Sequence, residues 1–101
     1  MGFLTKLKEK IMGKEKDFKA LIENGALVID VRSPEEFQSG NANGSRNIPL
    51  QTLGTKINEL KGKEVILVCR SGARAGSAKS TLEKNDIIAY NAGAWQNLNR
   101  L

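Results

Sequence analysis

The stretch Glu-Val-Ile-Leu-Val-Cys at residues 64–69 decides the fold of this 101-residue chain. Its five consecutive apolar residues are typical of a strand covered on both faces, as in a parallel sheet. A similar run, Ala-Leu-Val-Ile-Asp-Val, occupies residues 26–31. Helix signals follow each run within a few residues, so the sequence predicts βα units and a mainly parallel sheet.

The clearest helix start is Ser33-Pro34-Glu35-Glu36. Ser33 can cap the helix, Pro34 suits its first position, and Glu36 stands where a capping box requires a carboxylate. We therefore interpret Glu35 and Glu36 as helix-start residues rather than as catalytic carboxylates. Further helices are predicted at Asp17–Glu23, through Leu53, Ile57 and Leu60, at Ala73–Lys84, and around Trp95–Leu98 after Ala92–Gly93. Further strands are predicted at Asn47–Ile48 and Ile87–Tyr90.

The composition, with 40% apolar and 27% charged residues, is that of one globular domain. No apolar run approaches the roughly 20 residues that span a bilayer. Lysines interrupt the apolar residues of the first 13 positions, unlike a secretory signal peptide. We therefore expect a cytoplasmic protein without stable membrane insertion.

The N-terminal segment, residues 1–16, is predicted to be basic and amphipathic, and residues 17–101 to form the domain. Residues 1–19 contain six lysines and three acidic residues, and Phe3, Leu4, Leu7 and Ile11 recur at helical spacing. This segment either contacts an acidic partner or a membrane surface weakly, or packs as a solvated helix on the domain edge. No basic–aromatic motif is present, so we expect no nucleic-acid partner.

The chain has one cysteine and no histidine. An internal disulfide and a Cys/His zinc cluster are therefore excluded, and we expect neither a metal nor a cofactor. The commonest general base is also missing. Chemistry at Cys69 must depend on local electrostatics or on a reaction that needs little proton transfer.

Cys69 is predicted to lie at the carboxyl end of a central strand, before a turn and a helix N-terminus. Open α/β sheets bind ligands at that edge, and helix N-termini attract anions. The pKa of Cys69 should therefore be lowered, with Arg70 and Arg74 adding positive charge. Gly72 lets the backbone bend so that its N–H groups converge on an anionic sulfur or an oxyanion. The alternative is a structural cysteine at a buried strand end.

Three ordered motifs within residues 17–98 resemble the rhodanese-like domain family. The first is Val28-Ile29-Asp30-Val31-Arg32 with Glu35-Glu36-Phe37, Gly40, Gly44 and Arg46-Asn47-Ile48-Pro49. The second is Val65-Ile66-Leu67-Val68-Cys69-Arg70-Ser71-Gly72-Ala73-Arg74. The third is Tyr90-Asn91-Ala92-Gly93-Ala94-Trp95.

This resemblance implies an open, mainly parallel five-stranded α/β sheet with helices on both faces, and a thiosulfate sulfurtransferase without a cofactor. Cys69 would attack a small anionic sulfur donor and become a persulfide, which a thiol, a cyanide-like acceptor or an acceptor protein then discharges. The resemblance assigns substrate binding to the loop and support of the loop to Asp30 and Arg32. The loop residues are Arg70, Ser71, Gly72, Ala73 and Arg74.

Three other functions are alternatives for a cysteine loop of this kind. Phosphatases and arsenate reductases on the related scaffold separate cysteine and arginine by five residues, whereas four separate Cys69 from Arg74. The smaller loop favours sulfur transfer. A sulfur-carrier module that relays persulfide between proteins and a non-catalytic binding domain are the remaining alternatives, and the presence of Cys69 argues against the latter.

Overall fold

The computed structural model describes residues 17–100, in which helices and strands alternate along the chain. The elements, in order, are α1 (Phe18–Glu23), β1 (Leu27–Asp30), α2 (Pro34–Gln38), β2 (Arg46–Asn47), the 3₁₀ helix η1 (Leu50–Lys56), α3 (Ile57–Leu60), β3 (Val65–Cys69), α4 (Ala73–Lys84), β4 (Ala89–Ala94) and the 3₁₀ helix η2 (Trp95–Arg100). The predicted α/β class is confirmed, whereas the predicted N-terminal segment, residues 1–16, lies outside the described residues.

Within residues 17–100 the sheet has four strands in the order β2-β1-β3-β4, and every neighbouring pair is parallel. The open parallel sheet is thus confirmed, and the two apolar runs of the sequence form its central strands, β1 and β3. The resemblance implied five strands. No fifth is found in the described part, because the remaining stretches there form helices and turns.

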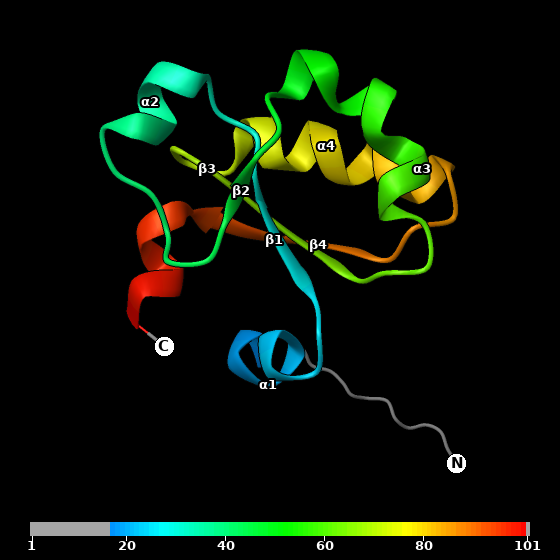
Figure 1. Ribbon diagram of the computed structural model, residues 1–101, viewed down its shortest axis with the longest axis horizontal. Coiled ribbons are helices and arrows are strands. Elements are labelled where there is room, and N and C mark those ends of the chain that lie inside the picture. The colour runs from blue at the N-terminus through cyan, green and yellow to red at the C-terminus, as the bar shows by residue number, and fades with distance from the viewer. Residues whose placement is uncertain (1–16, 101) are drawn as a thin grey trace.

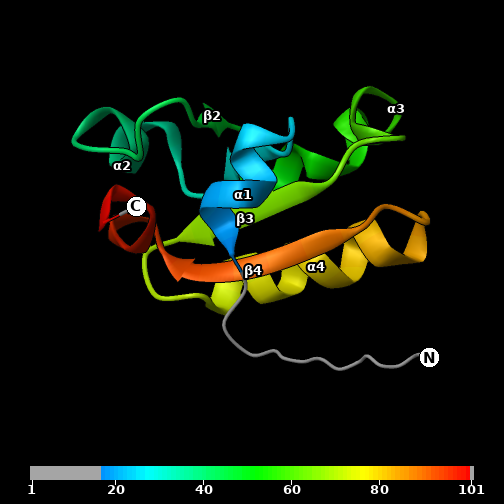
Figure 2. The ribbon, with the colours of Figure 1, turned by 90° about the horizontal axis from the view of Figure 1, so that it is seen from below.

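Helices cover both faces of the sheet (Figures 1 and 2). Side chains alternate along β3, so Val65, Leu67 and Cys69 enter one core cluster with residues of η1, α3 and α4. Ile66 and Val68 point the opposite way and pack with residues of α1 and η2. All five β3 residues are buried. Each large aliphatic side chain buried in this way contributes roughly 1.5–3 kcal/mol relative to exposure.

Two predicted elements differ from the observed ones. The helix expected through Leu53, Ile57 and Leu60 is a 3₁₀ helix for its first seven residues. The hydroxyls of Thr52 and Thr55 donate to the carbonyls three residues earlier, at 3.0 and 2.7 Å, which competes with regular α-helical bonding.

The last strand is also shifted relative to its prediction. The sequence predicts this strand at Ile87–Tyr90, with Ala92–Gly93 leading into the last helix, but β4 runs from Ala89 to Ala94. Backbone pairing with β3 extends it, with Cys69 opposite Ala94 after a shift in register between Leu67 and Cys69. This pairing is a tertiary interaction that overrides the local turn preference of Gly93.

Candidate active site

Cys69 ends β3 with its side chain buried, and residues 70–72 connect it to α4. The residue before α4 is Gly72, which has φ 111° and provides no side-chain cap. Its backbone N–H donates a hydrogen bond to Cys69 Sγ at 2.9 Å. The sulfur therefore faces the helix N-terminus at a position where other helices have a capping oxygen.

The pKa of Cys69 is the balance of two opposing effects. Burial raises the pKa, because it disfavours the charged thiolate, while the backbone N–H groups of Ala75, Gly72, Ser71 and Arg74 lower it. The N–H groups prevail, and the pKa lies below the ordinary cysteine value of 9.0. This is the direction that the sequence predicted, and it increases the fraction of nucleophilic thiolate.

The turn that carries Gly72 is tied to the end of β4. Asn91 Nδ2 donates to the Gly72 carbonyl at 2.9 Å, and Asn91 Oδ1 accepts from the Gly93 N–H at 2.8 Å. Gly72 also lies next to Gly93, because a Cβ built on Gly72 would be in ordinary contact with Gly93 Cα at 3.4 Å. Asn91 was not singled out from the sequence. The sequence feature that could have indicated Asn91 is its polar side chain within β4, the strand that pairs with β3.

Arg74, near the start of α4, forms a bidentate ion pair with Glu36 of α2. Arg74 Nη1 donates to Glu36 Oε1 at 2.7 Å, and Nη2 donates to Oε2 at 3.0 Å. Both side chains are about one-third exposed. Arg74 is therefore present at the site but already has a carboxylate partner. The other loop side chains, Arg70, Ser71 and Ala73, are exposed.

The helix-start interpretation of Glu36 is correct but incomplete. Ser33 and Glu36 form the predicted capping box, with Glu36 Oε1 accepting from Ser33 N–H at 3.0 Å. Oε2 is free of the cap and accepts from Arg74 instead. The sequence did not predict this contact, because it depends on α2 and α4 beginning at the same edge of the sheet.

Asp30 and Arg32 form a buried pair on the neighbouring strand end. Arg32 Nη2 donates to Asp30 Oδ2 at 2.7 Å, and Arg32 Nε donates to Oδ1 at 2.9 Å. The remaining Nη2 bond goes to the Gly40 carbonyl at 2.6 Å. Asp30 thus anchors the Arg32 guanidinium. Arg32 stabilises the segment up to Gly40 through its bond to the Gly40 carbonyl, but it makes no hydrogen bond to the cysteine loop. Any support of that loop by the Asp30–Arg32 pair is therefore indirect.

Trp95 packs against the core. It lies against the cluster on the α1 face, and the Arg32 guanidinium carbon is 5.1 Å from its ring centroid. A Cβ on Gly40 would approach Trp95 Cη2 to 3.1 Å. This close approach, together with a φ of 155°, explains why glycine suits position 40.

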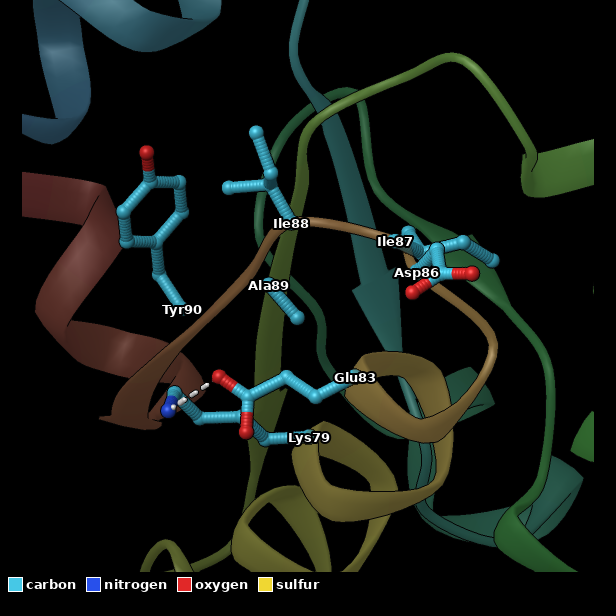
Figure 3. Close-up of a pocket in the computed structure, with 7 residues that line it drawn as sticks. All are labelled: Lys79, Glu83, Asp86, Ile87, Ile88, Ala89 and Tyr90. Carbon is cyan, nitrogen blue, oxygen red and sulfur yellow. Dashed lines mark hydrogen bonds and ion pairs between the residues drawn. The ribbon is translucent and has the colours of Figure 1, made fainter.

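A groove at the far end of the sheet is separate from Cys69. It is lined by residues from the end of α4 and the start of β4 (Figure 3), namely Lys79, Glu83, Asp86, Ile87, Ile88, Ala89 and Tyr90. Lys79 and Glu83 pair across one turn of α4, with 2.8 Å between Nζ and Oε2. The groove opens at the amino end of β4, whereas Cys69 lies at the carboxyl end of β3.

The described part of the chain contains neither a group of side chains suited to a metal ion nor a helix suited to a membrane. Between residues 17 and 100, no group of three or more His, Cys, Asp or Glu side chains is placed to hold a metal ion. In the same part, no helix is both long and apolar enough to cross a membrane.

A parallel sheet with a single cysteine facing a helix N-terminus defines a small α/β protein with a cysteine loop. The model of the Rhodanese-like domain matches residues 14–100. The chain therefore belongs to the rhodanese-like domain family, as the resemblance predicted.

Three curated relatives are similar to parts of this chain. "Uncharacterized protein YqhL" of Bacillus subtilis is 44% identical over 70% of the chain and 56% of its own length. "Putative sulfur carrier protein YrkF" of the same organism is 34% identical over 56% of the chain and 31% of its length. "Thiosulfate sulfurtransferase PspE" of Escherichia coli is 36% identical over 55% of the chain and 57% of its length.

The chain thus spans between about a third and just over half of these relatives. Among solved structures, a "rhodanese with anions from E. coli" superimposes with a TM-score of 0.67 and 30% identity, covering 72% of this chain and 91% of its own. The fold and the family are shared with proteins named as sulfurtransferases or as a sulfur carrier.

Proposed function

We propose that this chain is a thiosulfate-type sulfurtransferase that moves a sulfane sulfur from thiosulfate or a persulfide donor to a thiophilic acceptor through a Cys69 persulfide. The observation that carries the proposal is the Cys69 sulfur at the N-terminus of α4, where backbone N–H groups lower its pKa. The names of PspE and of the E. coli rhodanese add support. Arg70, Ser71, Gly72, Ala73 and Arg74 would form the substrate-binding loop.

The proposed reaction has two steps. The Cys69 thiolate attacks the outer sulfur of thiosulfate, the sulfur–sulfur bond breaks, and its electron pair leaves with sulfite. Cys69 then carries a persulfide anion. An acceptor such as cyanide attacks the terminal sulfur, forms thiocyanate and restores the thiolate. A thiol acceptor would take the sulfur in the same way and become a persulfide itself.

The electrostatics of the loop suit both states of Cys69. A thiolate and a persulfide are both anions, and the same N–H groups can stabilise either. Sulfite leaves without a proton from the protein, so the reaction needs no histidine. Exchange at sulfur depends mainly on the thiolate fraction, the nucleophile and the leaving group. A reduced thiol persists in the cytoplasm, which is the location we propose.

A sulfur-carrier role is the second candidate. The name of YrkF favours it, although that protein is much longer than the part matched here. A carrier would receive a persulfide from one protein and transfer it to another, with little turnover of free thiosulfate. The chemistry at Cys69 would be the same, and only the acceptor would differ.

The test is to load the reduced full chain with thiosulfate and, separately, with cysteine persulfide. Intact mass should increase by one sulfur atom, and added cyanide should then release thiocyanate. Cys69→Ser, which is nearly isosteric, should show no mass gain while unfolding at a similar temperature. A folded wild-type protein that gains no sulfur from either donor would disprove both candidate functions. Stable loading with negligible thiocyanate turnover would favour the carrier.

A further inference from the structure

The ion pair between Arg74 and Glu36 joins the cysteine loop to the first turn of α2. Two nitrogens of the guanidinium bond the two oxygens of the carboxylate, at 2.7 and 3.0 Å. The two residues come from the first turns of α2 and α4, which begin at the same edge of the sheet. An arginine that could clamp an incoming anion bidentately is thus already engaged in that geometry.

The negative charge of Glu36 is fixed in both position and ionisation. Oε1 also accepts from Ser33 N–H at 3.0 Å and from Ser33 Oγ at 3.1 Å. The hydrogen bond from Arg74, followed by that from the Ser33 backbone, lowers the pKa of Glu36 to about 2. Glu36 is therefore ionised at every pH at which a thiolate is available.

The Arg74 side of this pair interacts with the charge of Cys69. Glu36 raises the pKa of Arg74 most strongly, burial opposes this, and the charges of Cys69 and Asp30 raise it further. Arg74 is therefore within electrostatic range of the Cys69 sulfur. Arg32 is neutralised by Asp30. Arg74 is likewise paired with Glu36, which leaves Arg70 as the one arginine of the cysteine loop without a carboxylate partner among the described residues.

We propose that Glu36 is a specificity-determining residue that directs the site away from dianionic thiosulfate and toward persulfide donors of lower charge. This inference rests on the proposed sulfurtransferase function. Thiosulfate carries two negative charges next to the sulfur that is attacked, and the Glu36 carboxylate both repels them and holds the arginine that would compensate them. A persulfide of a small thiol or a protein presents at most one charge at its reactive end.

The persulfide reaction is chemically balanced without a further reagent. The Cys69 thiolate attacks the outer sulfur of the donor persulfide, RSSH, and the donor's sulfur–sulfur bond breaks. Its electron pair leaves on the donor thiolate, RS⁻, while the transferred SH becomes the outer group of the Cys69 persulfide. The negative charge therefore moves from the Cys69 thiolate to the departing thiolate, and the neutral donor adds no charge that the site must compensate.

The variant that tests this is Glu36→Gln. Glutamine also completes a capping box, so the start of α2 should persist while the negative charge is removed. The second-order rate constant for loading Cys69 should rise about five- to tenfold with thiosulfate and by less than twofold with cysteine persulfide, each followed by intact mass. Because the effect is electrostatic, the gain with thiosulfate should shrink as salt is raised.

Glu35→Gln is the matched control. It removes the same charge from the neighbouring position of α2, where the side chain is exposed and has no partner within residues 17–100. It should leave the ratio of the two loading rates within twofold of wild type. Glu36→Asp, which keeps the charge, should also remain close to wild type.

Two results would overturn the inference. The first is an unchanged ratio of the two loading rates in Glu36→Gln, whether neither rate rises or both rise equally. The second is an equal gain with thiosulfate in Glu35→Gln. The absence of loading from either donor in the folded wild type would instead disprove the proposed function, and with it this inference. Thermal unfolding of each variant separates these outcomes from loss of structure.

Discussion

The connections after β1 and β3 leave adjacent strands at the same edge of the sheet, and each leads through three residues into a helix. After β1, side chains within the connection bond its polar groups. Ser33 caps the free N–H groups of α2, and Asp30 pairs with the guanidinium of Arg32. After β3, Gly72 precedes α4 without a side-chain cap, and the nearby N–H groups face the Cys69 sulfur.

This difference shows that the connection after β1 stabilises the fold, whereas the connection after β3 presents its N–H groups to the reactive sulfur. A serine or aspartate before α4 would offer its own oxygen to the helix N–H groups. With glycine there, these groups remain available to an anion on Cys69. In the connection after β1, these donors are already bonded to side chains of the connection itself, so few remain to bind a ligand. The following predictions test this contrast, from the largest expected effect to the smallest.

Asp30→Ala should destabilise the domain most, by about 3–5 kcal/mol, because Arg32 would be left buried without its counter-charge. Cys69→Ala, at the equivalent strand end, should cost about 1 kcal/mol, since it removes only a small side chain. Denaturant unfolding measures both values.

Asp30→Asn keeps an acceptor for Arg32 and should fall between these two variants. A loss below about 1 kcal/mol in Asp30→Ala would mean that Arg32 does not depend on Asp30. The two connections would then not differ in the way described above.

Gly72→Ala should raise the pKa of Cys69. Alanine disfavours a φ of 111°, so the turn and its N–H should move away from the sulfur. The strain should also cost about 1–2 kcal/mol. The rate of Cys69 alkylation against pH measures the shift, and the variant's curve should lie at higher pH than that of wild type.

Ser33→Ala, in the connection after β1, is the control for Gly72→Ala, because both positions directly precede a helix. It should cost about 1 kcal/mol through loss of the cap and leave the alkylation curve unchanged. An equal shift of the curve in both variants would contradict the separation of roles.

The lowered pKa of Cys69 also predicts how stability depends on pH. Since the folded pKa lies below the ordinary value, the ionised thiolate stabilises the fold at pH above that ordinary value. This stabilisation is lost as the pH falls through the folded pKa. The stability of wild type relative to Cys69→Ser should therefore increase as pH is raised toward 9.

Asn91→Ala should have the smallest effect on the loop. It removes the bonds to Gly72 and Gly93, which should cost about 1 kcal/mol and raise the pKa of Cys69 by less than Gly72→Ala does. Asn85→Ala removes a similar bond, to the Thr81 carbonyl, at the far end of α4. A shifted alkylation curve in the Asn85 variant, or none in the Asn91 variant, would show that Asn91 does not position the loop.

Local patterns predicted much of this molecule. The apolar runs at residues 26–31 and 64–69 became the central strands, and Ser33 with Glu36 formed the predicted capping box. Their success has a physical reason, since burial on both faces and capping depend on residues close together in the chain. The position of Cys69 before α4 followed from the same patterns.

Contacts between distant segments could not be predicted in this way. The pairing of Glu36 with Arg74 joins residues 38 positions apart, and the bond from Asn91 to Gly72 joins residues 19 apart. The extension of β4 to Ala94 likewise depends on a backbone partner in β3. The sequence by itself determined the parallel α/β fold and the cysteine at a helix N-terminus, because short-range patterns encode both. Only the tertiary structure decided which charges surround that cysteine, because neighbouring strand ends bring those side chains together.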